Sequence, residues 1–298
     1  MEGKRAETES CSAITVVSGF ATGRGVTIGI NLPCRVTAEL MPRGGYSSEV
    51  RVDSAVRDPH SLVETCVLNS LRTLHVALKR DELVQITVNS EIPAAAGLKS
   101  SSALSVAVVK AIYDLFSSGY ANNSQKILRL SCESSIESGA SLTGAFDDAA
   151  AGLLGGLVFS DNLRFKLLSH RSLNPKAGSL VKLLVPSQEK LTSSLKLSDY
   201  RRYAREGEEA IHFAREEIIT QAMVLNSMIH ALIHRYSMQP IVSAIDEGAY
   251  AAGISGKGPA VAAICPNSKT GSRVEKRWLA ENSNCKIVSA SVTKARAS

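Results

Sequence analysis

The stretch Glu91–Ala111, E-I-P-A-A-A-G-L-K-S-S-S-A-L-S-V-A-V-V-K-A, decides the fold of this chain. A strand is predicted directly before it, over Leu83–Asn89, because apolar and polar side chains alternate there. Small residues follow Pro93 and predict a loop, since proline cannot continue a central strand. A helix is predicted to begin at the serines, with apolar side chains recurring at helical spacing behind them. The stretch therefore reads as a strand, a small-residue loop and a helix.

A small-residue loop that ends at a serine-rich helix start suits the binding of phosphate. The first backbone N–H groups of a helix have no partner within the helix, and the helix dipole favours an anion there. Small side chains let the phosphate approach the backbone, and serine hydroxyls add donors. The residues expected to form this loop are Pro93, Ala94, Ala95, Ala96, Gly97, Leu98, Lys99, Ser100, Ser101, Ser102 and Ala103.

Length and composition are typical of a soluble globular protein of one large or two ordinary domains. The chain has 298 residues, of which 44% are hydrophobic and 21% charged. No apolar run reaches the roughly 18 residues of a membrane span, and the charged N-terminus lacks a secretory signal, so we expect a cytoplasmic protein without a membrane partner. The net charge of 34 − 28 = +6 is dispersed and only 5% of residues are aromatic, which argues against a nucleic-acid partner.

Cysteine and histidine spacing predicts neither disulfides nor a metal site. The six cysteines stand singly, without a C-x-x-C pair, as is typical of reduced thiols in a cytoplasmic protein. His230 and His234 are four residues apart on a predicted helix, but no acidic or cysteine partner accompanies them.

The order of predicted elements is that of an α+β protein. Strands are predicted between Ala13 and Val52, and helices from Asp58 to Lys79 and over Asn123–Ser138. Beyond Asp161 the pattern changes. The later predictions are a strand over Val181–Val185, helices from Asp199 to Tyr250 broken near Gln239, a glycine-rich loop over Gly253–Pro259, a strand over Ala260–Ile264, and a final helix and strand from Ser272 to Val292. We expect two domains, residues 1–165 and 166–298.

The sequence matches none of three common phosphate-binding motifs. A P-loop needs G-x-x-x-x-G-K-[ST], and Gly256-Lys257-Gly258 lacks both the first glycine and the final hydroxyl. Gly23–Gly29 has one residue too many for a dinucleotide-binding fingerprint, and a strand-like segment follows it instead of a helix. The H-R-D and D-F-G motifs of protein kinases are absent.

The motifs that are present resemble those of the GHMP kinases, the family of galactokinase, homoserine kinase and mevalonate kinase. Ala21–Asn31, A-T-G-R-G-V-T-I-G-I-N, resembles the family's first motif, although Thr22 replaces the usual proline and Ile30-Asn31 the usual Glu-His. Ile92–Ala103 resembles its phosphate loop, P-x-x-x-G-L-G-S-S-A-A. Gly253–Ile264 resembles its C-terminal glycine loop. The three motifs occur in the family's order.

This resemblance implies a fold, cofactors and roles for residues. The fold would be α+β, with a ribosomal-protein-S5-like N-terminal domain, a ferredoxin-like C-terminal domain and the active site between them. ATP and Mg²⁺ would be the cofactors, with Ser101 and Glu137 as metal ligands. Asp148 would act at the acceptor hydroxyl, although the spacing does not separate it from Asp147. Arg24 would lie near the reacting groups or serve as a turn residue.

Within the family, G-L-K-S-S-S-A and T-G-A-F-D-D-A (Thr143–Ala149) resemble the archaeal-type shikimate kinases. The implied acceptor is shikimate, whose carboxylate would need a basic residue such as Arg24, Arg43 or Lys99. Homoserine, pantoate or mevalonate as acceptor would keep every motif and change only the pocket. Outside the kinases, the motifs would also be compatible with a catalytically silent regulatory relative or with an RNA binder. The sequence is also compatible with a homo-oligomer.

Overall fold

The computed structural model describes residues 4–42, 49–54, 61–93, 97–117, 123–174, 178–187 and 196–296. Its first β-sheet has the strand order β3-β4-β2-β5-β6, with β1 paired to β2 as well. All pairs are antiparallel except β3 with β4. The strands are β1 (Arg5–Val17), β2 (Arg24–Pro42), β3 (Glu49–Ser54), β4 (Glu82–Ser90), β5 (Leu157–Asp161) and β6 (Lys166–Arg171).

Strand β2 organises this sheet because it changes partner along its 19 residues. Its first part, from Arg24 to Ile28, pairs with β5, and the part from Cys34 to Pro42 pairs with β4. The change occurs around Pro33, next to the shift in its register with β1. A proline cannot donate to a sheet ladder and is tolerated at such an irregularity.

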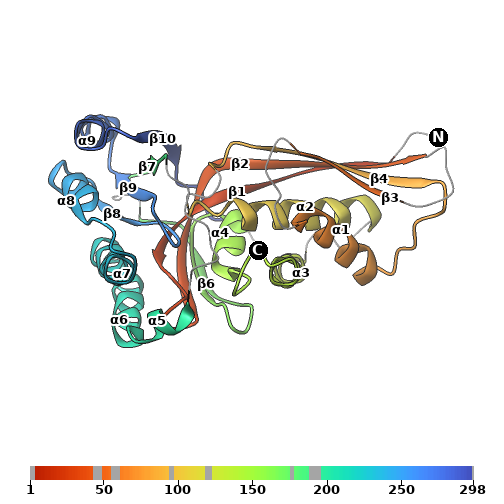
Figure 1. The fold of residues 1–298 in the computed structure, drawn as a ribbon, viewed down its shortest axis with the longest axis horizontal. Coiled ribbons are helices and arrows are strands. Elements are labelled where there is room, and N and C mark those ends of the chain that lie inside the picture. Colours follow the sequence, from red (N-terminus) through yellow and green to blue (C-terminus); the bar gives the residue numbers. More distant parts are fainter. Residues whose placement is uncertain are drawn as a thin grey trace.

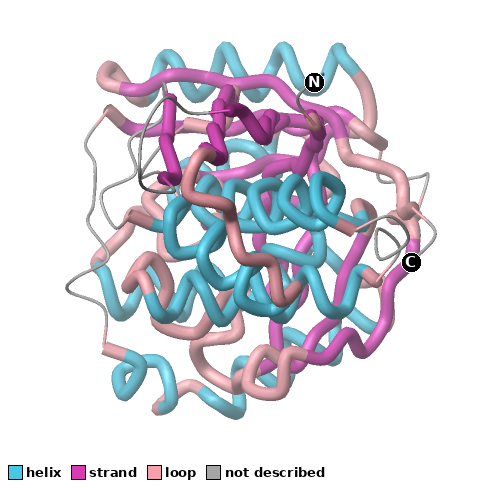
Figure 2. The backbone as a smooth tube through the Cα atoms, turned by 90° about the vertical axis from the view of Figure 1, so that its right-hand side faces the viewer, coloured by secondary structure: helices cyan, strands magenta, loops and turns pink. Residues whose placement is uncertain are grey.

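The described residues of the first half form four helices, and those labelled α1, α2 and α3 lie beneath the long strands (Figure 1). They are α1 (Leu62–Thr73), α2 (Ser100–Phe116), α3 (Ser124–Glu137) and α4 (Phe146–Leu154). Helix α2 is the central one, since nearly all its side chains from Ser102 to Leu115 are buried. Near the N-terminus, strands lie above a stack of helices in the side view (Figure 2). The predicted phosphate loop thus leads into the most buried helix of this half.

The second half builds an antiparallel sheet of order β10-β7-β9-β8. The elements of this half of the chain are β7 (Leu180–Pro186), α5 (Leu197–Arg201), α6 (Ala204–Arg215), α7 (Ile219–His234), α8 (Gln239–Asp246), β8 (Ala251–Ile254), β9 (Val261–Cys265), α9 (Ser268–Glu281) and β10 (Cys285–Ser291). One apolar core contains Ile14 and Val106 of the first half together with Val181 and Ala262 of the second. The two sheets therefore share a core, and side chains from both halves can meet at one site.

Most predicted elements are confirmed, including the α+β class, the strand before the loop and the helix at the serines. The helix predicted to reach Lys79 instead ends at Thr73, because the backbone of His75 is left-handed at φ 53°. Gly253 and Ile254 belong to β8 rather than to a loop. All six cysteines are free thiols. The division into domains at residues 165 and 166 stays a prediction.

Among the described residues, the helices are all too short or too polar to cross a membrane.

Candidate active site

Two glycine-containing loops that are distant in sequence pack directly on each other. The Ser255 hydroxyl donates to the Gly97 carbonyl oxygen at 3.1 Å, and Gly256 N–H donates to Thr15 Oγ1 at 2.9 Å. The Ser12 hydroxyl donates to the carbonyl of Leu98 at 2.7 Å. Strand β1 and the loop after β8 therefore hold the end of the predicted phosphate loop in place. The residues of the predicted site that lie outside the described ones are Ala94, Ala95, Ala96 and Arg43.

Gly97 is required at this junction, and its replacement by alanine is expected to destabilise the fold by about 2 kcal/mol or more. Its φ is +79°, and an added Cβ would lie 2.4 Å from the Ser255 carbonyl oxygen. Gly139→Ala is the matched control, because Gly139 has a similar φ of +76° but nothing within 4 Å of an added Cβ. Urea unfolding measures both. Equal losses would show that the contact with Ser255 contributes nothing.

The start of α2 offers hydrogen-bond donors to an anion. Lys99 precedes the helix with φ 64° and no side-chain cap. Of the serines that follow, Ser100 is half-buried, Ser101 exposed and Ser102 buried. The first N–H groups of a helix have no acceptor within it, and small side chains leave them accessible. This geometry suits a phosphate group.

The Lys99 side chain turns inward to the start of α4. Its ammonium nitrogen lies 2.9 Å from Asp148 Oδ1, and the two side chains are only 9% and 10% exposed. No donor in the described chain makes an aligned hydrogen bond to that oxygen, so the contact is an ion pair. A Cβ added at Gly256 would lie 3.2 Å from the Lys99 ammonium nitrogen. Lys99 thus lies between the second glycine loop and a buried carboxylate.

Asp147, the neighbour of Asp148, is fully engaged by other side chains. The Thr27 hydroxyl donates to its Oδ2 at 2.9 Å, and Asn162 Nδ2 donates to its Oδ1 at 2.7 Å. A Cβ at Gly25 would lie 2.2 Å from Asp147 Oδ2, so only glycine leaves room for this carboxylate. Asp147 is therefore fixed against β2 and the turn after β5, while Asp148 faces Lys99.

Burial raises the pKa of Asp148 from 3.8 to about 7. The adjacent Asp147 adds to the increase, and the Lys99 ammonium opposes it. A carboxylate with a pKa near neutrality can exchange a proton under physiological conditions. The arrangement therefore combines a helix start that suits an anion, a cation and a titratable carboxyl group.

Glu137 is exposed at the last turn of α3, and its Oε2 accepts from Asn69 Nδ2 at 2.7 Å. Ser101 is exposed as well. Both offer the oxygen ligands that Mg²⁺ prefers. Three or more acidic, histidine or cysteine side chains do not gather into a metal site among the residues that the structure describes. Further oxygen ligands would then have to come from a bound phosphate or from water.

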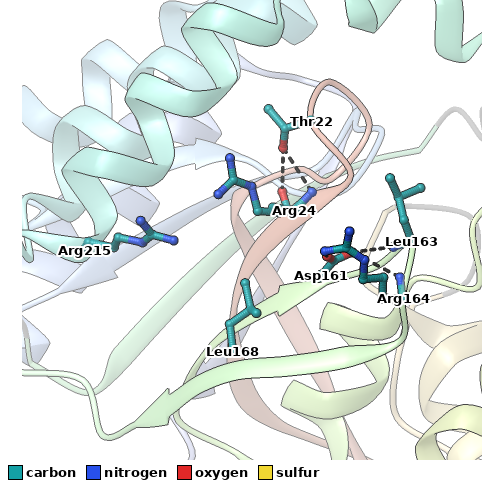
Figure 3. Close-up of a pocket in the computed structure, with 7 residues that line it drawn as sticks. All are labelled: Thr22, Arg24, Asp161, Leu163, Arg164, Leu168 and Arg215. Carbon is teal, nitrogen blue, oxygen red and sulfur yellow. Dashed lines mark hydrogen bonds and ion pairs between the residues drawn. The ribbon is translucent and has the colours of Figure 1, made fainter.

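Arg24 is not brought to these carboxylates. Its guanidinium pairs with Glu208 of α6, and its backbone N–H donates to the Thr22 hydroxyl at 3.0 Å. Arg24 lies opposite Asp161 in the β2–β5 register, whereas the next residue, Gly25, abuts Asp147. Neighbouring strand residues point to opposite faces, so Arg24 faces away from Asp147. It lines a cavity of about 410 Å³ with Thr22, Asp161, Leu163, Arg164, Leu168 and Arg215 (Figure 3).

Thr27 and Asn162 hold Asp147, although neither is predicted from the sequence as a site residue. Thr27 lies within the first motif, at a position that the motif leaves unspecified. Asn162 follows β5 directly and bonds to Asp147 twice, since its Oδ1 also accepts from the Asp147 N–H at 3.0 Å. A polar residue at the end of a strand is a weak signal, and nothing in its spacing points to residue 147.

Family profiles match two segments of the chain, and known relatives match most of its length. Residues 62–156 match the family profile described as GHMP kinases N terminal domain, and residues 220–284 match GHMP kinases C terminal. A shikimate kinase of Pyrococcus furiosus is 36% identical over 90% of this chain and 93% of its own length. A shikimate kinase of Thermococcus kodakarensis is 35% identical over 85% of this chain and 89% of its own length.

Solved structures with 18% identity or less share the fold. A homoserine kinase of Cytophaga hutchinsonii has a TM-score of 0.72, covering 99% of this chain and 96% of its own, at 18% identity. The mevalonate kinase of Methanococcus jannaschii has a TM-score of 0.73 and is 14% identical. The match covers 99% of this chain and 100% of that kinase.

Proposed function

This chain belongs to the GHMP kinase family, and from that premise we propose that it is a shikimate kinase, which transfers the γ-phosphoryl group of ATP to the 3-hydroxyl of shikimate in aromatic amino-acid biosynthesis. The observation that carries the proposal is the identity of 36% along nearly the whole length of a shikimate kinase. The solved homoserine and mevalonate kinases are 18% identical or less and support the fold alone.

The proposed roles follow from the geometry of the site. The start of α2, with Ser100, Ser101 and Ser102, would bind the phosphates of ATP. Asp148 would accept the proton of the acceptor hydroxyl or orient it for attack. Lys99 would hold Asp148 in place and keep it ionised, since the two are 2.9 Å apart. Asp147 would act as a positioning residue, because both its oxygens already accept hydrogen bonds.

A magnesium ion would be held by the oxygen ligands of Ser101 and Glu137. When bound, it would neutralise charge on the phosphates during transfer. Asn69 would orient the Glu137 carboxylate through its hydrogen bond of 2.7 Å. Arg24 remains a candidate at the acceptor only if its ion pair with Glu208 opens.

The proposal is tested by an acceptor panel in a coupled ADP-release assay. We expect turnover with shikimate, and kcat/KM for homoserine, pantoate and mevalonate lower by at least about 10³-fold, since a site built for polar groups rejects acceptors that leave those groups unpaired. Asp148→Asn protein gives the background rate of ATP hydrolysis. Turnover of another acceptor without turnover of shikimate would contradict the proposal and leave the family assignment intact.

A further inference from the structure

Two buried polar atoms of helix α7 have no hydrogen-bond partner among the described residues. Asn226 is 2% exposed and His230 is fully buried, yet Asn226 Nδ2 and His230 Nε2 are both unpaired in that part of the chain. Most buried polar groups in proteins are paired, because an unpaired one destabilises the fold. The two residues are four apart, so their side chains lie on one face of the helix.

The other polar atoms of these two side chains are held firmly. Asn226 Oδ1 accepts from the Ser18 N–H at 2.8 Å. The Tyr200 hydroxyl lies 3.1 Å from His230 Nδ1 and 2.6 Å from His234 Nε2, and the rings of Tyr200 and His230 meet edge to face at 5.1 Å. The directions of Asn226 Nδ2 and His230 Nε2 are therefore fixed before any ligand arrives.

The backbone that Asn226 holds adjoins the candidate active site. Ser18, which Asn226 holds, precedes Gly19, where an added Cβ would lie 2.6 Å from Asn162 Nδ2. That same nitrogen donates to Asp147. Burial lowers the pKa of His230 to about 3, with further lowering by His234 and by the Lys99 ammonium. His230 is thus neutral, and its pKa is lowered in part by Lys99, the lysine that pairs with Asp148.

The chemistry of the two atoms selects a hydroxyl group. Asn226 Nδ2 donates. His230 Nε2 donates when the Tyr200 hydroxyl donates to Nδ1 of the neutral ring, and accepts when Nδ1 carries the proton. A hydroxyl can meet either form, but a carboxylate can meet only the donating one. A neutral imidazole also adds no charge with which to attract an anion.

We infer that Asn226 and His230 bind a hydroxyl group of the acceptor, one that is not phosphorylated. The inference rests on the proposed function, because it requires an acceptor with more than one hydroxyl. Shikimate carries hydroxyls at positions 4 and 5 besides the one at position 3. Neither His230 nor Asn226 belongs to a motif of the sequence, and the acceptor contact would come from the second half of the chain.

The test is His230→Phe, which removes the unpaired nitrogen and leaves the Tyr200 hydroxyl its contact with His234. We expect KM for shikimate to rise about 5–10-fold, the loss of one neutral hydrogen bond, with KM for ATP within about twofold and an equal or higher thermal midpoint. The exposed His212 of α6 supplies the control, His212→Phe, with unchanged constants. Asn226→Ser repeats the measurement on the second atom and keeps the test decisive if the phenylalanine variant does not fold.

Deoxy analogues separate a direct contact from an effect of packing. Wild-type protein should use either 4-deoxyshikimate or 5-deoxyshikimate about 5–10-fold less well, and the variants should not discriminate against that analogue. An unchanged KM for shikimate, or an equal loss with every acceptor, would overturn the inference. If wild-type protein instead uses another acceptor of the panel, the proposed function fails, and the His230→Phe comparison with that acceptor still decides the role of α7.

Discussion

Asp148→Asn is expected to lower kcat with shikimate by about 10³-fold, within the range that a positioned base contributes to catalysis. Asparagine keeps the shape of the side chain but cannot accept a proton. The start of α2 is unaffected, so KM for ATP should change little. The measurement is steady-state kinetics at pH 8. The control is Asp114→Asn, since Asp114 also pairs with a lysine, Lys110, on the same helix α2 but far along it from the serines.

The pH dependence of the wild-type protein tests the same role. The pKa of Asp148 is raised to about 7, so the carboxyl group is mostly protonated at pH 6 and mostly ionised at pH 8. Because the ionised form is the active one, kcat/KM should rise with pH through about 7 and level off above about pH 8. The residual activity of Asp148→Asn should lack this acid limb. An acid limb that persists unchanged would assign the titration to another group.

Lys99→Met is expected to lower kcat at pH 7 by about 10²-fold, comparable to the loss of one preorganised charge at a reacting centre. The Lys99 ammonium holds the pKa of Asp148 down, so its removal should raise that pKa further and move the acid limb to higher pH. Activity should then partly recover at pH 9. A limb that stays near pH 7 would show that the ion pair does not control Asp148.

Stability gives a second readout of the same substitution. A carboxyl group whose pKa is raised on folding contributes stability at low pH. That contribution is lost as the pH rises through the pKa of the group in the folded protein. Lys99→Met should therefore unfold at nearly the wild-type temperature at pH 6 and well below it at pH 9. Lys110→Met removes the partner of Asp114, which is more exposed than Asp148, and should lose less stability across this range.

The loop and helix around the serines could be predicted because their signals are local. Proline, glycine and serine restrict the backbone within a few residues of themselves, and the buried face of α2 repeats at helical spacing. The same holds for the start of α8 at Gln239-Pro240, just after the break that follows His234, whereas the breaks after Arg201 and Arg215 were not predicted. The end of α1 was harder, since the apolar pattern continues to Leu78 while the backbone turns at His75.

The choice between Asp147 and Asp148 could not be made from spacing. Neighbouring residues of a helix point about 100° apart, so each faces a different environment. Thr27 and Asn162, far from them in sequence, take up both oxygens of Asp147. Among the described residues, Lys99 forms its ion pair with Asp148 and not with Asp147. The neighbours across the fold separate the two carboxylates.

The sequence by itself determined the small-residue loop that is predicted to bind phosphate, the order of the motifs and the family to which they belong, because each depends on residues close together in the chain. Only the tertiary structure decided which carboxylate faces Lys99, that Arg24 pairs with Glu208, and that Asn226 holds the backbone of Ser18. These contacts join residues 49 to 208 positions apart, as with Lys99 and Asp148 or Ser18 and Asn226. Such pairs leave no local pattern, since the shared core of the two sheets brings them together.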